Sequence, residues 1–188
     1  MEIVVAITGA SGVVIGARLL EVLAEQGDHQ VHLLVSAAAE AVIVQEMGAA
    51  VHLPATHRWD VGSFSAPIAS SSRAPDAMAI APCSMKTLAA IAHGFADDLI
   101  VRTAETMLRL HRPLVLMPRE TPLSLAAIEN MRHAKLAGAI LLPPVVAYYF
   151  SPQTIEQVTD FFVGKVLDVL GLEHRLYQRW GECKRQRG

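Results

Sequence analysis

The chain has 188 residues, of which 52% are hydrophobic, and its formal net charge is -2. This length fits one α/β domain with a substantial core, and the charge gives no sign of nucleic-acid binding or of a polybasic membrane anchor. No apolar run reaches the roughly 18 residues that a membrane span needs. The mean hydropathy of +0.35 therefore predicts buried strands and the apolar interfaces of a homo-oligomer. The first residues lack the charged start of a signal peptide, so we expect a cytoplasmic protein.

Strand and helix patterns alternate from the start of the chain. Residues 2–8 form an apolar, β-branched run that ends at a glycine-rich turn, and residues 13–26 carry apolar side chains at helical spacing. A second strand is expected over residues 31–35, followed by an alanine-rich helix that ends at residue 46. Residues 48–75 are rich in proline and serine, which predicts an irregular connection with room for one short strand or helix.

The second half of the chain continues this alternation. Strands are expected over residues 77–81, 113–117 and 139–142. Helices are expected over residues 84–92, 98–110, 124–137 and 154–170, with Gly171 ending the last one. Such alternation predicts a three-layer α/β fold, in which a doubly wound parallel sheet carries helices on both faces, as in Rossmann and flavodoxin-like folds. We expect a single domain over residues 1–182 and a basic tail over residues 183–188.

Small, hydroxyl and charged residues follow the predicted strands, where ligands of such sheets bind. These residues are Gly9-Ala10-Ser11-Gly12, Ser36, Ser84-Met85-Lys86-Thr87 and Arg119-Glu120. The glycine-rich turn lets backbone N–H groups approach a phosphate at a helix N-terminus. Its spacing matches neither the dinucleotide fingerprint nor a P-loop, so a plain tight turn is the alternative interpretation.

The other residues also have structural interpretations. Ser36 and Ser84 fit helix N-caps, although a cap at Ser84 leaves Thr87 unexplained. Arg119-Glu120 fits either phosphate binding or a surface ion pair. Tyr149 and Lys165 together fit a phosphate clamp, and singly fit a pocket wall and a solvated helix face. The histidines and the two cysteines show no metal or disulfide spacing.

Six motifs give the chain a specific resemblance. It is similar to the flavin prenyltransferases (the UbiX-like family) over residues 3–182. The motifs are Thr8-Gly-Ala-Ser-Gly12, Pro82-Cys-Ser-Met-Lys-Thr87, Arg112-Pro-Leu-Val-Leu-Met-Pro-Arg-Glu-Thr-Pro122, Glu129-Asn-Met131, Tyr149 with Pro152-Gln153, and Arg179-Trp-Gly-Glu182.

The resemblance implies an activity and its partners. Reduced FMN would receive a dimethylallyl group from dimethylallyl monophosphate at N5 and C6, without a metal, as phosphate leaves and a fourth ring closes. The prenylated FMN would serve as cofactor of a UbiD-type decarboxylase. A dodecamer built from trimers is implied as well.

The resemblance also assigns roles to matching positions. Ser11 and Glu46 would lie near the flavin N5 and C6, where a proton must be removed, and Glu120 would handle the phosphate proton. FMN would contact Gly9, Ala10, Ser11, Ser36, Ser84, Met85, Lys86, Thr87 and Arg119. The prenyl-phosphate pocket would contain Arg102, Arg109, Glu120, Tyr149 and Lys165, with Trp180 as a wall across a subunit boundary.

The chain departs from the family pattern at four positions. Ile15 stands where an aromatic residue is common, and Ser71 stands where many relatives have glycine. Arg109 and Lys165 exchange arginine and lysine relative to some relatives, which keeps the charge but changes the geometry of hydrogen bonding.

Two other functions are weighed against prenyl transfer. A flavin-dependent cysteine decarboxylase would require a catalytic histidine and an asparagine-rich signature where this chain has Cys83-Ser-Met-Lys-Thr87. A flavin carrier that only stores or delivers FMN fits the flavin motifs equally well. It gives no reason for Glu120, Tyr149 and Lys165 to occur together.

Overall fold

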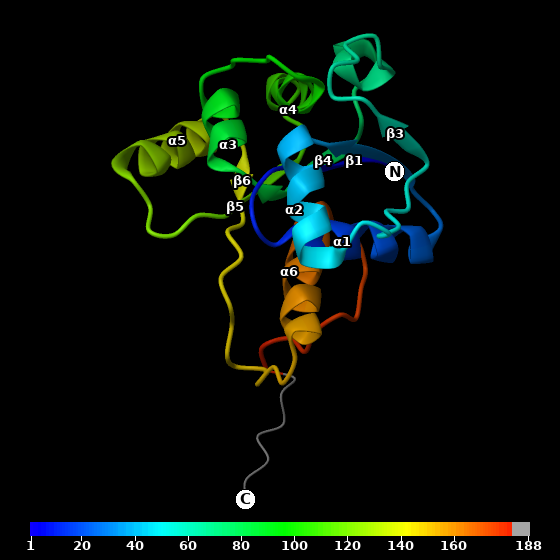
Figure 1. The fold of residues 1–188 in the computed structure, drawn as a ribbon, viewed down its shortest axis with the longest axis vertical. Helices are drawn as coiled ribbons and strands as arrows, with labels where there is room; N and C mark the ends of the chain where they lie inside the picture. Colours follow the sequence, from blue (N-terminus) through cyan, green and yellow to red (C-terminus); the bar gives the residue numbers. More distant parts are fainter. Residues whose placement is uncertain (182–188) are drawn as a thin grey trace, which may run out of the picture.

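A parallel sheet forms the centre of the computed structural model, which describes residues 1–181 (Figure 1). The predicted domain end at residue 182 and the basic tail lie outside the described residues. Six strands of the described chain pair in the order β3-β2-β1-β4-β5-β6, and every pairing is parallel. The strands are β1 (Glu2–Ile7), β2 (Gln30–Val35), β3 (His57–Trp59), β4 (Ala77–Cys83), β5 (Leu114–Pro118) and β6 (Ile140–Leu141). This is the strand order of dinucleotide-binding folds, with its switch point between β1 and β4.

Helices cover both faces of the sheet, which confirms the predicted three-layer fold. One apolar core joins the sheet to α1 (Val13–Gln26), α2 (Ala37–Met47) and α6 (Ile155–Leu170). A second core joins the other face to α3 (Met85–Ala92), α4 (Leu99–Arg109) and α5 (Leu125–Leu136). Val5 of β1 belongs to the first core and Val4 to the second, and both are fully buried. A strand buried on both faces has no polar side, so its sequence is continuously apolar.

The structure departs most clearly from the sequence-based expectation in three segments. The irregular connection contains β3 and two short 3₁₀ turns, Pro67–Ala69 and Ser71–Arg73. Strand β4 continues to Cys83, two residues beyond its expected end, because Cys83 still pairs with Pro118 of β5. Strand β6 has two residues where four were expected. Short edge strands carry little apolar sequence, so their ends depend on pairing with a neighbour.

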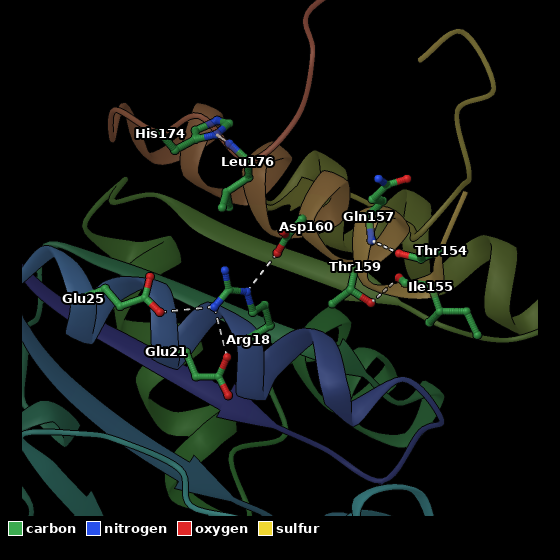
Figure 2. A network of polar contacts seen from close by, with 10 residues as sticks. All are labelled: Arg18, Glu21, Glu25, Thr154, Ile155, Gln157, Thr159, Asp160, His174 and Leu176. Atoms are coloured by element: carbon green, nitrogen blue, oxygen red, sulfur yellow. Dashed lines mark hydrogen bonds and ion pairs between the residues drawn. The ribbon is translucent and has the colours of Figure 1, made fainter. Parts of the chain in front are cut away.

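Two close contacts position α1 on the sheet. A Cβ atom added to Gly16 would lie 2.2 Å from the carbonyl oxygen of Ala81, so this glycine lets α1 approach β4 closely. Arg18 holds α1 to α6 through Asp160, at 2.9 Å, and also contacts Glu21 and Glu25 of its own helix (Figure 2). Among residues 1–181, no helix combines the length and apolar character that crossing a bilayer demands.

Candidate functional site

The turns that follow β1 and β4 are joined by one buried hydroxyl. Thr8 Oγ1 donates a hydrogen bond to the carbonyl of Pro82, at 2.8 Å, and accepts one from the backbone N–H of Ser84, at 2.7 Å. Thr8 is fully buried, so both hydrogen bonds are shielded from water. The predicted flavin motifs of the two turns therefore lie side by side at the switch point of the sheet.

The Gly9–Gly12 turn is held against α2. A Cβ atom on Gly9 would lie 2.4 Å from Cβ of Ala38, so the turn and the start of α2 are in direct contact. Gly12 adopts a φ of +94°, a left-handed conformation that favours glycine. Ser11 lies exposed between these two glycines. The turn thus presents the Ser11 hydroxyl on a backbone that is constrained by the contact of Gly9 with α2 and by the left-handed conformation of Gly12.

A carboxylate from α2 occupies the N-terminus of α1. The two carboxylate oxygens of Glu46 accept from the N–H of Gly12 at 3.1 and 3.0 Å, and one also accepts from Val13 at 3.2 Å. These N–H groups and the positive end of the helix dipole form a ready-made anion site. A phosphate placed there would meet the negative charge of Glu46. The structure brings Glu46 next to Ser11, the other predicted residue of the proton-removing site.

Ser36 and Ser84 are helix N-caps, as one interpretation predicted. Ser36 Oγ accepts from the N–H of Ala39 at 3.2 Å, and Ser84 Oγ accepts from that of Thr87 at 3.3 Å. Ser84 Oγ also donates to Thr87 Oγ1 at 3.1 Å, which gives the buried Thr87 a structural role that its sequence position did not reveal. Capping serines leave other N–H groups of each first turn available to an anion.

Lys86 is held by two carboxylates at the start of α4. Its ammonium lies 3.2 Å from Asp97 and 3.4 Å from Asp98. Desolvation disfavours the charged amine, but the hydrogen bonds and charges of the two aspartates outweigh it and raise the pKa of Lys86. The lysine therefore stays protonated and links α3 to α4. Its predicted neighbour Met85 packs against the second core.

The end of β5 places two charged residues beside the end of β4. The N–H of Arg119 donates to the carbonyl of Cys83 at 3.2 Å, and Glu120 accepts from the N–H of Thr121 at 2.9 Å. Arg119 and Glu120 are exposed. The neighbouring Cys83 thiol is fully buried in the second core, and this burial raises its pKa to about 12. Cys83 is thereby unsuited to act as a nucleophile.

Arg102 and Arg109 line one cavity together. This cavity of about 630 Å³ lies between α4 and the serine-rich connection, and it also contains Ser71. Arg102 donates to the carbonyl of Ala69 at 3.1 Å, and both arginines contact Glu105, at 2.9 and 3.5 Å. The two guanidinium groups thus form a basic pair with one shared counter-ion.

Tyr149, Lys165 and Trp180 form a second group around α6. The Tyr149 ring lies 5.2 Å from that of Trp180 in an edge-to-face arrangement. The Lys165 ammonium lies 3.5 Å from both the Tyr177 hydroxyl and the Asp168 carboxylate. Tyr177 and Asp168 were not predicted as site residues. The spacing of Asp168, one helical turn after Lys165, was the only sequence signal for that contact.

A single chain keeps these two groups apart. A cavity of about 590 Å³ near α6 is lined by residues of two segments, 150–157 and 174–179, and it shares no lining residue with the Arg102–Arg109 cavity. Figure 1 shows α4 and the loop that leads into α6 towards opposite ends of the molecule. In a single chain, Arg102 and Arg109 therefore line a cavity that neither Tyr149 nor Lys165 lines.

Comparison with known proteins places this arrangement among flavoproteins. Residues 1–167 match the protein family described as Flavoprotein. The chain is 42% identical over 184 residues to the flavin prenyltransferase UbiX of Methanocaldococcus jannaschii, which covers 96% of this chain and 99% of the relative.

Solved structures agree with the sequence relatives. AnUbiX (PadA1), in complex with FMN and dimethylallyl pyrophosphate, superposes with a TM-score of 0.91 and 42% identity over 97% of this chain and 98% of that chain. A dodecameric FMN-dependent UbiX-like decarboxylase from Escherichia coli O157:H7 gives a TM-score of 0.91 with 38% identity, over 96% of this chain and 99% of that one.

Proposed function

The chain belongs to the flavin prenyltransferase family, and we propose that it transfers a dimethylallyl group from dimethylallyl monophosphate to reduced FMN. The observation that carries the proposal is the Glu46 carboxylate, held by the N–H groups of Gly12 and Val13 beside Ser11. A proton acceptor fixed at the switch point, next to a turn of small residues, fits a reaction that removes a proton from a bound planar ring.

The residues at the strand ends fit FMN. Bound reduced FMN supplies the nucleophilic N5 and C6 atoms that accept the dimethylallyl group. Ser11 and Glu46 would take up the proton released before ring closure. Because the Glu46 charge disfavours a second anion at α1, we infer that the flavin phosphate is held at the first turns of α2 and α3, near Ser36 and Ser84. Arg119, beside the end of β4, would hydrogen-bond the flavin or its phosphate.

The remaining predicted residues would handle the donor. Arg102, Arg109 and Lys165 would stabilise the negative charge of the departing phosphate. Glu120 would exchange a proton with that phosphate, and Tyr149 would donate a hydrogen bond to it. Trp180, packed edge-to-face with Tyr149, would cover the apolar dimethylallyl group. No step in this assignment requires a metal.

We further propose that the site is shared between subunits of a dodecamer built from trimers. The support is that the cavity lined by Arg102 and Arg109 includes neither Tyr149 nor Lys165 of the same chain, together with the dodecameric state of the E. coli relative. A neighbouring α6 would bring Lys165 to the arginines of α4. The prenylated FMN would then pass to a UbiD-type decarboxylase.

Mass spectrometry of the extracted flavin tests the function. Protein incubated anaerobically with reduced FMN and dimethylallyl monophosphate should yield a flavin heavier by one C5 unit. A parallel incubation with the diphosphate shows which donor is used. An unmodified flavin, from protein that binds FMN and both donors, would refute prenyl transfer and favour the flavin carrier.

A further inference from the structure

Asp168, in the last turn of α6, contacts four side chains that carry hydrogen-bond donor groups. Its Oδ1 accepts from His174 Nε2 at 2.9 Å and from Arg179 at 2.7 Å. Its Oδ2 accepts from the Tyr177 hydroxyl and lies 3.5 Å from the Lys165 ammonium. Three of the four donors belong to the segment that follows α6, and the fourth is the predicted phosphate-binding lysine. We call these five residues the Asp168 cluster.

The segment after α6 packs directly on the helix backbone. A Cβ atom added to Gly164 would lie 2.6 Å from Tyr177 and 2.7 Å from His174, so the absence of a side chain makes room for both rings. His174 Nδ1 accepts from the N–H of Leu176 at 3.3 Å (Figure 2), which leaves Nε2 to donate to Asp168. Backbone contact and hydrogen bonding therefore fix the same segment.

This fixed segment carries a wall of the predicted donor pocket. Residues 174–179 line the cavity near α6 together with four residues of the 150–157 segment, and Trp180, the predicted wall residue of the donor pocket, follows directly and packs on Tyr149. Trp180 is 81% exposed, so burial of its own side chain contributes little to holding it in place. The position of Trp180 thus depends on the residues just before it.

The same carboxylate restrains Lys165. The ammonium lies between Asp168 and the Tyr177 hydroxyl, and 5.8 Å from the centre of the Tyr177 ring. An unrestrained lysine would lose side-chain entropy on binding a phosphate, whereas a lysine held beforehand has already lost much of it. Asp168 therefore restrains two residues that are predicted to contact the prenyl donor, Lys165 and Trp180.

We propose that Asp168 is a positioning residue for the prenyl donor: it holds residues 174–179 on α6 and thereby fixes Trp180 against Tyr149 and Lys165 beside Tyr177. Asp168 does not itself touch the donor or the flavin in this assignment. The inference rests on the proposed function for the identity of the donor. Its structural part, the holding of the segment, stands on the contacts of the Asp168 cluster alone.

The experiment compares Asp168→Asn with Asp160→Asn. Asp160 is a matched control because it lies on the same helix, is similarly exposed and forms an ion pair with Arg18, away from the segment after α6. A third variant, Tyr177→Phe, removes one hydroxyl of the cluster and keeps the ring that packs on Gly164.

Two measurements that do not depend on turnover are made on each FMN-loaded variant. The first is the rate of trypsin cleavage after the exposed Arg175, which reports local release of the segment. The second is the Kd for dimethylallyl monophosphate by calorimetry, beside the Kd for FMN. We expect Asp168→Asn to raise both the cleavage rate and the donor Kd by about tenfold, and the FMN Kd by less than about twofold. Tyr177→Phe should give smaller changes in the same direction, and Asp160→Asn should match the wild type.

The outcomes separate this inference from the proposed function. Wild-type cleavage and donor affinity in Asp168→Asn would overturn the positioning role. Equal weakening of FMN and donor binding in Asp168→Asn would also overturn it, because this result points to general destabilisation. If Asp168→Asn does not fold, a normal donor Kd in Tyr177→Phe would overturn it for the same reason. A wild-type protein that binds the donor but leaves the flavin unmodified would refute prenyl transfer alone.

Discussion

The carboxylate of Glu46 lies 3.0 Å from the backbone nitrogen of Gly12, although the two residues are 34 positions apart in the sequence. This contact fixes a charged side chain of α2 at the positive end of α1, beside Ser11. In the proposed reaction, this contact would equip the turn with a proton acceptor, in place of the phosphate that the helix N-terminus could have bound. Under that proposal the turn would face the reacting ring atoms of the flavin and not its phosphate.

Glu46→Gln should separate the structural and chemical roles of this carboxylate. The neutral amide loses the charge–dipole interaction, so we expect the free energy of unfolding to fall by about 1 kcal/mol. Prenyl transfer should slow by about a hundredfold or more with little change in FMN affinity, because proton removal loses its acceptor. Single-turnover assays and urea unfolding measure the two effects. Glu40→Gln, on the same helix, is the control, and normal transfer in Glu46→Gln would remove Glu46 from the chemistry.

Glu120→Gln should retain FMN binding and slow transfer. Glu120 is exposed and accepts only a local hydrogen bond from Thr121 in the described structure, so its replacement should leave the fold intact. A carboxyl group that exchanges a proton in the transition state contributes about a hundredfold or more to the rate. Stopped-flow measurement of flavin prenylation checks this. The control is Glu25→Gln, which replaces an exposed carboxylate of α1. If Glu120→Gln transfers the prenyl group as fast as this control, Glu120 is excluded from the mechanism.

Mixed oligomers should reveal whether the site is shared between subunits. Arg102→Ala and Lys165→Ala should each weaken transfer strongly when present in every chain. If each site takes Arg102 from one chain and Lys165 from a neighbour, random mixing of the two variants in equal amounts restores about a quarter of the sites. Co-expression with two different tags, followed by assay of doubly purified oligomers, measures this recovery. Activity no greater than that of the separate variants would place all the cations in one chain.

The stability contributed by Asp168 should depend on pH. Partial burial favours the neutral acid, but the hydrogen bonds from Arg179, Tyr177 and His174 outweigh it and hold the pKa of Asp168 well below its ordinary value. The pKa is thus lower in the folded than in the unfolded protein, where it is about 3.9. Such a group stabilises the folded state above its unfolded pKa, and this contribution is lost as the pH falls through that value towards the folded pKa.

The corresponding measurement is urea unfolding of wild type and Asp168→Asn over a range of pH. We expect the wild type to be more stable at pH 7, with a difference that stays constant down to about pH 5 and shrinks below about pH 4. A difference that is the same at every pH would show that the carboxylate charge does not contribute.

Gly16→Ala should destabilise the fold through a steric clash. The added Cβ would lie 2.2 Å from the Ala81 carbonyl oxygen and 2.8 Å from Ile7, both at the packed interface of α1 and the sheet. Overpacking of this kind costs about 1–3 kcal/mol. Gly62→Ala is the control, since its Cβ would approach only one side-chain atom, Oδ1 of the Asp60 carboxylate, at 3.0 Å. Thermal unfolding of both variants decides the point, and equal stability would show that α1 can shift on the sheet at little cost.

The sequence alone determined the layers of this protein and the residues at its strand ends. Continuous apolar runs such as that of β1 arise because the strand is buried on both faces, and helical spacing is visible within one element. Since the carboxyl ends of parallel strands meet at one edge, the order of the elements was enough to place the flavin motifs after β1 and β4 together. The caps at Ser36 and Ser84 were equally local, because a cap acts within one turn.

Only the tertiary structure decided how distant side chains combine. The short edge strand β3 exists through pairing with β2, which its own sequence hardly signals. The contact of Glu46 with Gly12 and the collection of donors by Asp168 join positions that no spacing rule connects. The sequence likewise did not show that Arg102 and Arg109 line a cavity without Lys165, because matching a family motif does not say which residues share a cavity in one chain. Periodicity reports contacts within an element, whereas contacts between elements depend on how the whole chain packs.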